Sequence, residues 1–244
     1  MEQRYPERRP MTPSERAAAR KRAARRRKQR RIKRFLRFCF VALIGVTIFV
    51  ICRKTIPIIK RLFVTSPAAS QKALDEGALD IVQDFLTPNP YSRPQEELKE
   101  IKNVVVHYTA NPGTDAQANR NYFESLKDSG ATYASSHFVI GLDGTIIQCI
   151  PLNEISYASN ERNVDSISIE CCHPDETGKF NKKTYDSLIQ LTAWLADEYN
   201  LSEKQIIRHY DVKGKACPLY FVEHEDAWEQ FKKDVFAYKK KKGK

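Results

Sequence analysis

The chain has 244 residues, of which 41% are hydrophobic and 10% aromatic, so its length allows one or two domains with a real core. Residues 1–37 hold 16 of the 41 basic residues and three of the 30 acidic ones, a local charge of +13 that exceeds the formal charge of +11 of the whole chain. The remainder holds 25 basic and 27 acidic side chains. The positive charge therefore belongs to a tail and does not indicate a nucleic-acid-binding fold.

The second half of residues 1–37 consists mainly of Arg, Lys and Ala, which predicts that 1–37 is a disordered or interfacial cytoplasmic tail. An uncharged run from Phe38 to Cys52 follows, and its apolar flanks lead us to expect a transmembrane anchor over 38–58. Because the denser positive charge precedes this run, we expect a single-pass cell-membrane protein whose N-terminus is cytoplasmic and whose remaining chain is outside. A cleaved signal peptide fits less well, since the basic region is long and no A-x-A site follows. A buried soluble helix is the other alternative.

Residues 59–96 read as a stalk or linker. The apolar residues between Ser70 and Phe85 have helical spacing, and three prolines between Thr87 and Pro94 then interrupt regular structure. A compact domain is expected over 97–238, with a solvated Lys-rich tail over 239–244.

Within 97–238, strands and helices alternate. Strands are expected at Asn103–His107 and Ser166–Cys171, and a hairpin turning at Leu142-Asp143-Gly144 joins 136–141 to 145–150. Helices are expected at Asp115–Leu126, Lys182–Tyr199 and Glu223–Tyr238. This order predicts an α/β fold in which a mixed central sheet is flanked by helices.

Three residues of this domain could form a metal site. His107 follows the apolar run Val104–Val106, His209 follows Ile206 and Ile207, and Cys217 lies eight residues further on. Two imidazoles and a thiolate that leave a fourth position open are typical of catalytic zinc sites. The alternative is that each histidine is a half-buried polar residue and that Cys217 packs in the core.

The ordered motifs His107-Tyr108-Thr109, Ser136-His137-Phe138, Ser168-Ile169-Glu170, His209-Tyr210-Asp211 and Lys215-Ala216-Cys217-Pro218 resemble those of the type-2 N-acetylmuramoyl-L-alanine amidases. That family includes phage amidase-lysozymes and peptidoglycan recognition proteins. The resemblance covers roughly Pro94 to Lys233 and leaves out the anchor and most of the stalk. It implies Zn²⁺ held by His107, His209 and Cys217, and hydrolysis of the amide between the lactyl group of N-acetylmuramic acid and L-alanine.

The resemblance also implies catalytic roles for two more residues. Lys215 matches the family's lysine that stabilises the tetrahedral state, and Glu170 matches a glutamate that serves as general base. A solvated loop lysine and a structural ion pair are the alternative interpretations. The tyrosine that some members use directly before the His-Phe pair is replaced here by Ser136.

Substrate contacts are expected to differ from those of relatives that carry Trp-His in the loop that here reads Ser156-Tyr157-Ala158-Ser159. The candidates for substrate contacts are Tyr108, Thr109, Tyr157, Asn160 and Arg162. The expected partners are peptidoglycan or a muropeptide and the cytoplasmic membrane, with no nucleic acid; the sequence does not indicate an oligomeric state. A non-catalytic, membrane-tethered peptidoglycan-recognition module is the alternative, and the presence of Cys217 speaks against it.

Overall fold

A computed structural model describes residues 65–242. The predicted cytoplasmic tail, the anchor over 38–58 and the first part of the predicted stalk lie outside the described residues. Among residues 65–242, no helix combines the length and apolar character that a membrane crossing requires.

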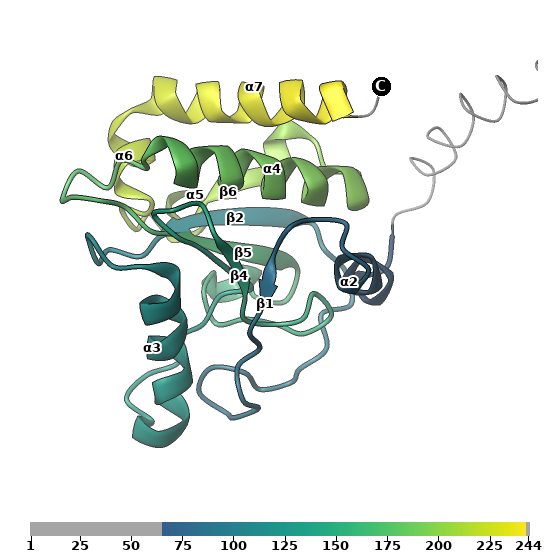
Figure 1. The fold of residues 1–244 in the computed structure, drawn as a ribbon, viewed down its shortest axis with the longest axis vertical. Coiled ribbons are helices and arrows are strands. Elements are labelled where there is room, and N and C mark those ends of the chain that lie inside the picture. The colour runs from purple at the N-terminus through teal and green to yellow at the C-terminus, as the bar shows by residue number, and fades with distance from the viewer. Residues whose placement is uncertain (1–64, 243–244) are drawn as a thin grey trace, which may run out of the picture. The chain divides into compact units, whose positions relative to one another are not determined.

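The described chain is built on one six-stranded mixed sheet with the strand order β1-β4-β3-β5-β2-β6 (Figure 1). Its strands are β1 (Val82–Gln83), β2 (Asn103–Tyr108), β3 (Phe138–Ile140), β4 (Ile146–Gln148), β5 (Ser166–Cys171) and β6 (Ile206–Arg208). Strands β3 and β4 form the predicted antiparallel hairpin, and every other neighbouring pair is parallel. The structure therefore confirms the mixed central sheet that the sequence predicts.

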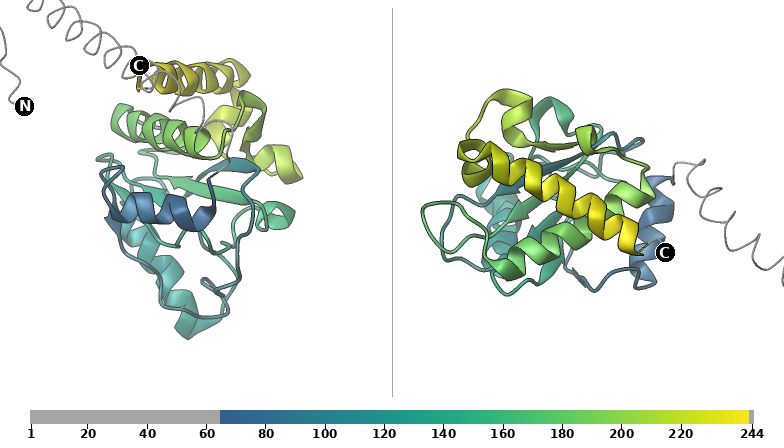
Figure 2. Two further views of the ribbon diagram at one scale, coloured as in Figure 1. Left: turned by 90° about the vertical axis from the view of Figure 1, so that its right-hand side faces the viewer. Right: turned by 90° about the horizontal axis from the view of Figure 1, so that it is seen from above.

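Helices cover both faces of the sheet. Helices α4 (Lys182–Glu198) and α7 (Glu225–Lys242) pack on each other above one face, as Figure 2 shows from two sides, and α3 (Ala116–Ser129) lies against β3 and β4 on the other. The shorter helices are α2 (Pro67–Asp75), α5 (His209–Lys213) and α6 (Leu219–Glu223), with 3₁₀ turns η1 (Asn160–Arg162) and η2 (Glu203–Gln205). The three helices expected over 115–126, 182–199 and 223–238 are all present, although α7 begins two residues later and continues to Lys242.

The alternation of side chains along the strands produces two cores. On β5, Ile167 and Ile169 enter the core beneath α4 and α7, while Ser168 and Glu170 face the other way. Val139 of β3 and Ile147 of β4 instead join Phe123 of α3 in a smaller core. The period-two pattern of 166–171 therefore predicts both the strand and the face on which Glu170 lies.

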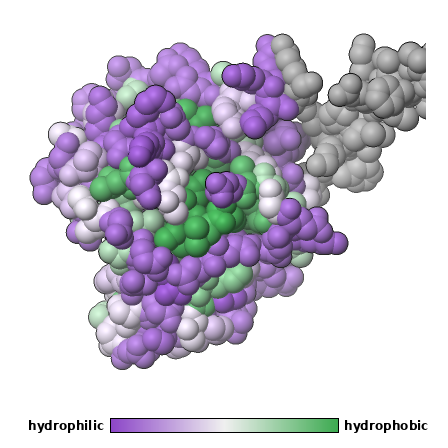
Figure 3. Space-filling model, in the orientation of Figure 1, coloured by the Kyte–Doolittle hydropathy of each residue, from purple (hydrophilic) through white to green (hydrophobic). Residues whose placement is uncertain are grey.

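Residues 65–96 are packed on the sheet and do not form a stalk, which corrects the predicted boundary at residue 97. Leu74 of α2 and Leu86 are buried in the two cores, and β1 pairs with β4. The helical spacing over Ser70–Phe85 gives only the short helix α2, which is followed by Gly77 at φ +85°, a conformation that favours glycine. The space-filling view shows apolar surface in the middle of the face on which β1 lies (Figure 3).

Candidate active site

Three neighbouring parallel strands bring the predicted ligands to one edge of the sheet. His107 lies near the carboxyl end of β2, Glu170 is its register partner on β5, and His209 comes directly after β6 as the first residue of α5. The chain then turns at Gly214, and the backbone N–H of Tyr210 donates to the carbonyl of Cys217 at 2.9 Å. Because parallel strands end at the same edge, residues 110 positions apart meet there.

The donor atoms of His107, His209 and Cys217 all lie within 4.8 Å of one another, and all three residues are buried. Sγ of Cys217 is 3.7 Å from Nδ1 of His107, and the two imidazole rings lie edge to face with their centroids 4.7 Å apart. The structure therefore brings together the three residues that the sequence predicts as ligands.

Neighbouring polar groups orient both imidazoles. Nε2 of His107 lies 3.1 Å from Oγ of Ser159, and Nε2 of His209 lies 2.8 Å from Oδ1 of Asn160. With these nitrogens engaged, Nδ1 of each ring is the atom left to bind an ion. Hydrogen bonds to the far nitrogen are the usual way in which proteins orient metal-binding histidines. This donor set fits zinc, which favours imidazole nitrogen and thiolate sulfur.

Burial shifts the pKa values of the cluster. Desolvation, followed by the charges of neighbouring groups, holds the pKa of His107 well below its usual range, and desolvation also lowers that of His209. Both imidazoles are therefore neutral near pH 7, which is the form that binds metals. Burial and the nearby Glu170 raise the pKa of Cys217 to about 12, so binding a metal here displaces the thiol proton.

Glu170 is the buried carboxyl group of this site. Its Oε1 lies 3.9 Å from Nδ1 of His107, while Oε2 is buried and has no hydrogen-bond partner among the described residues. Burial raises the pKa of Glu170 to about 8, and the charge of Lys215 opposes this shift. A buried carboxyl group with a raised pKa and one oxygen free of hydrogen bonds is suited to proton transfer. Among residues 65–242, no lysine or arginine forms the structural ion pair with Glu170 that the sequence left open.

A cleft of about 370 Å³ opens beside the three ligands. Of the predicted substrate contacts, Tyr108, Tyr157 and Asn160 line this cleft with Glu170 and Lys215. Two others do not line it. Thr109 extends the backbone pairing by donating to the carbonyl of Cys171, and Arg162 forms an ion pair with Asp165. The four cysteines of the described chain, Cys149, Cys171, Cys172 and Cys217, are free thiols.

Two further residues position the site and were not anticipated. Arg208, the last residue of β6, is buried and forms an ion pair with Asp211 at 2.8 Å, which fixes the start of α5 and hence His209. Oδ1 of Asn163 accepts hydrogen bonds from the backbone of Ala158 and Ser159, which places Ser159 beside His107. Both contacts are local, joining residues three to five positions apart, but Arg and Asn at these positions have no distinctive pattern that would indicate a positioning role.

A family model described as N-acetylmuramoyl-L-alanine amidase, Amidase_2, matches residues 97–219, just over half of the chain. The chain belongs to this amidase family. Its matched region contains the three candidate ligands, Glu170 and Lys215. The membership confirms the resemblance inferred from the ordered motifs.

Curated relatives agree with this assignment. The amidase CwlL of Bacillus licheniformis is 34% identical over 169 residues, which cover 64% of this chain and 46% of CwlL. The amidase BlyA of Bacillus subtilis is 31% identical over 174 residues, 63% of this chain and 46% of BlyA. The chain thus spans about half the length of the curated relatives it matches.

Solved structures extend the comparison to the fold. The catalytic domain of XlyA is 30% identical, with 64% of this chain and 99% of that domain covered and a TM-score of 0.54. PlyL, at 24% identity and a TM-score of 0.55, shares the fold. The segment that begins the described chain, 65–96, precedes the region matched by the amidase family model.

Proposed function

We propose that this protein is a zinc-dependent N-acetylmuramoyl-L-alanine amidase. It would hydrolyse the amide between the lactyl group of N-acetylmuramic acid and the L-alanine of the stem peptide. The observation that carries the proposal is the buried cluster of His107, His209 and Cys217, which opens into a cleft beside Glu170, whose Oε2 has no hydrogen-bond partner among the described residues. A zinc ion held by these three side chains would supply a Lewis acid that polarises the scissile carbonyl and acidifies water.

The proposal gives Glu170 the role of general base and then general acid. Its carboxylate takes a proton from the attacking water and gives it to the leaving nitrogen, so the carbon–nitrogen bond breaks as a neutral amine leaves. A pKa raised to about 8 suits both steps, since the group can hold and release a proton near neutral pH.

Lys215 is proposed to stabilise the negative charge that develops on the amide oxygen. It lines the same cleft as Glu170, and its charge acts on His107, His209 and Glu170. A fixed cation at the position where charge develops lowers the barrier more than it stabilises the bound substrate. Asn160 and Ser159 position the two imidazoles in this scheme, and Tyr108 and Tyr157 form walls that a substrate would contact.

The test is a digestion of purified peptidoglycan by the full-length protein, with products identified by mass spectrometry. We expect released stem peptides with a free L-alanine amino terminus, loss of this product after chelation, and its return on addition of Zn²⁺. Binding of peptidoglycan without any cleavage would instead assign the protein to the recognition class.

We further propose that residues 38–58 anchor the enzyme in the cytoplasmic membrane with its N-terminus inside, so that it acts on the wall within reach of the membrane. The support is the sequence alone: an uncharged apolar run preceded by sixteen basic residues. Fractionation of cells that express the full chain tests this proposal. Recovery in the membrane fraction after a high-salt wash is expected, and recovery in a soluble fraction would contradict it.

A further inference from the structure

A second hollow of about 570 Å³ adjoins the active-site cleft. Its walls come from 88–90 and 93–96 and from Tyr133 and Tyr157, and the same two tyrosines line the cleft itself. We call this space the tyrosine hollow. Because Tyr133 and Tyr157 belong to both spaces, a ligand that reacts in the cleft can continue into the tyrosine hollow. Residues 88–96 lie outside the region matched by the amidase family model.

Two tyrosine rings, those of Tyr133 and Tyr157, line the hollow, and the ring of Tyr91 packs against Tyr133 without lining it. The ring centroids of Tyr133 and Tyr157 are 5.6 Å apart, and those of Tyr91 and Tyr133 are 5.4 Å apart. The side chain of Tyr133 is unusually open, with 63% of its surface exposed. An exposed ring held between two others offers a flat apolar face with polar hydroxyl groups at its rim, which suits an amphipathic ligand.

These three rings are held in place by the backbone. The N–H of Ala134 donates to the carbonyl of Tyr91, and the N–H of Ser135 donates to the carbonyl of Tyr157. Tyr91 also packs on the end of α3, where a Cβ added at Gly130 would lie 3.0 Å from its Cζ. The three rings therefore come from three segments that hydrogen bonds connect.

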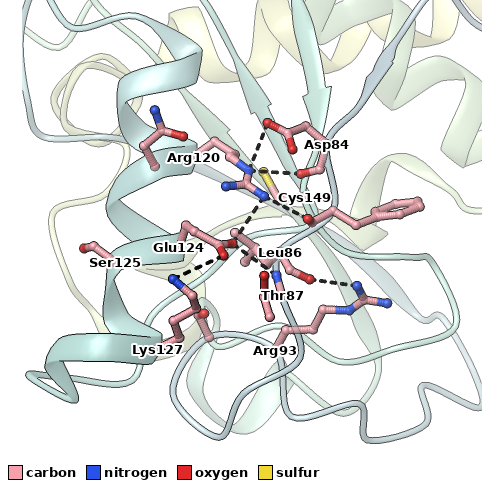
Figure 4. A network of polar contacts seen from close by, with 12 residues as sticks. Asp84, Leu86, Thr87, Arg93, Arg120, Glu124, Ser125, Lys127 and Cys149 are labelled. Carbon is pink, nitrogen blue, oxygen red and sulfur yellow. Dashed lines mark hydrogen bonds and ion pairs between the residues drawn. The ribbon is translucent and has the colours of Figure 1, made fainter.

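The wall formed by 88–90 and 93–96 is preformed as well. The preceding residues are bound to α3 by Arg120, whose guanidinium donates to the carbonyls of Asp84 and Phe85, and by Glu124, which accepts from the N–H of Thr87 (Figure 4). Within the wall, Oδ1 of Asn89 accepts from the N–H groups of the next turn. A ligand would meet a surface that needs little ordering on binding.

The charges of the tyrosine hollow favour a neutral ligand. The cation among its lining residues, Arg93, is already paired: it forms a bidentate ion pair with Glu154 at 2.7 and 2.8 Å and donates to the carbonyl of Leu86. Glu96 adds a carboxylate to the same lining. Stem peptides carry carboxylates, which would find no free cation among these residues and would be repelled by Glu96. N-acetylated sugars of a glycan strand are neutral and present both apolar faces and hydroxyl groups.

We propose that the tyrosine hollow is a glycan subsite, in which Tyr133 stacks on a pyranose ring next to the muramyl residue that reacts in the cleft. This assignment rests on the proposed amidase function, because the glycan strand is the neutral part of the peptidoglycan substrate. With such a subsite, the protein would cleave amides on glycan strands in preference to amides of muramyl peptides that carry a single sugar.

The first experiment measures binding and needs no catalysis. Tetra-N-acetylchitotetraose, a peptide-free chain of four N-acetylglucosamines, is titrated into the full-length protein and followed by calorimetry, and a free stem pentapeptide is titrated in parallel. We expect chitotetraose to bind, Tyr133→Ala to weaken binding about tenfold, and Tyr133→Phe to retain most of it. The matched control is Tyr122→Ala, because Tyr122 is also an exposed tyrosine, at 52%, but lies outside both linings.

The second experiment compares kcat/KM on amides borne on glycan strands with kcat/KM on N-acetylmuramoyl-L-alanyl-D-isoglutamine, a single-sugar substrate. We expect Tyr133→Ala to lower the ratio of the two values about tenfold, mainly through KM for the strand, and Tyr122→Ala to leave it within twofold. Binding of the pentapeptide but not of chitotetraose, or equal behaviour of the two alanine variants, would overturn the assignment. Chitotetraose binding that depends on Tyr133 without any hydrolysis would retain the subsite and reject the amidase proposal.

Discussion

Replacing Leu74 by Ala tests whether α2 belongs to the fold. Leu74 is 3% exposed and contacts the core beneath α4 and α7, although it precedes the region matched by the amidase family model. Removing a buried leucine side chain costs about 2–5 kcal/mol, depending on how far the cavity closes. Because α2 lies at the edge of the core and can shift inward, we expect a loss near the lower middle of this range, about 3 kcal/mol.

The assay is equilibrium unfolding of the full-length protein in urea, followed by far-ultraviolet circular dichroism, with thermal unfolding as a second measurement. For a domain of this size, 3 kcal/mol corresponds to a decrease in Tm of about 6–12 °C. The control is Lys72→Ala on the same helix, whose side chain is 76% exposed and whose replacement is expected to cost less than about 0.5 kcal/mol. A loss below about 1 kcal/mol in Leu74→Ala would mean that α2 is a detachable linker.

Three further outcomes are expected. Glu170→Gln keeps the shape of the side chain but cannot accept the proton, so kcat falls about 10²–10⁴-fold while zinc content by elemental analysis is unchanged; unchanged kcat would remove Glu170 from the mechanism. Arg120→Ala leaves two backbone carbonyls without their donor, and we expect it to lower the free energy of unfolding in urea by about 2–4 kcal/mol and to speed amide exchange in 84–93. Lys127→Ala, in the same network, should have a much smaller effect (Figure 4). Equal losses of stability in the two variants would show that Arg120 does not hold this segment on α3. Burial lowers the pKa of His137 to about 4, so the stabilisation from keeping this imidazole neutral is complete above about pH 6.5 and is lost as pH falls toward 4, roughly 3 kcal/mol in total. In His137→Gln the free energy of unfolding should therefore depend less on pH between about 6.5 and 4. An unchanged pH dependence would refute the lowered pKa of His137.

The sequence predicted well the parts of the fold that have a local pattern. The strict alternation over 166–171 predicted β5 with the bounds that the structure shows, and the turn at Asp143-Gly144 predicted the β3–β4 hairpin. Both patterns arise because a strand with one face toward each core must alternate its side chains. The ordered motifs identified the three candidate ligands before the structure showed them together.

The packing of 65–96 could not be predicted in the same way. Strand β1 is only two residues long, and its partner β4 lies 65 positions further along the chain, so the pairing leaves no local pattern. The prolines between Thr87 and Pro94 were interpreted as a linker, yet this segment forms a wall of the tyrosine hollow. Prolines indicate where regular structure ends, but the contacts of an irregular segment depend on the surface it meets.

The positioning roles of the polar residues around the ligands could also not be predicted from the sequence. Asn160 was expected to contact substrate, but its Oδ1 lies 2.8 Å from Nε2 of His209, which makes it a positioning residue as well as part of the cleft wall. Ser159 lies 52 positions from His107, and Arg208 directly precedes His209, but neither residue belongs to a motif that indicates a positioning role. The contacts of Ser159 with His107 and of Asn160 with His209 join residues 52 and 49 positions apart, so they follow from the tertiary fold.

The most direct test of the central claim measures zinc content and amidase product in the same samples of three full-length proteins: wild type, Cys217→Ser and Cys149→Ser. Cys149 is a matched control, because it is also a buried free thiol but belongs to the core beneath α3. We predict about one zinc per chain and stem peptides with free L-alanine termini for the wild type and Cys149→Ser, and neither for Cys217→Ser. Amide cleavage by zinc-free protein, or full zinc content in Cys217→Ser, would contradict the account.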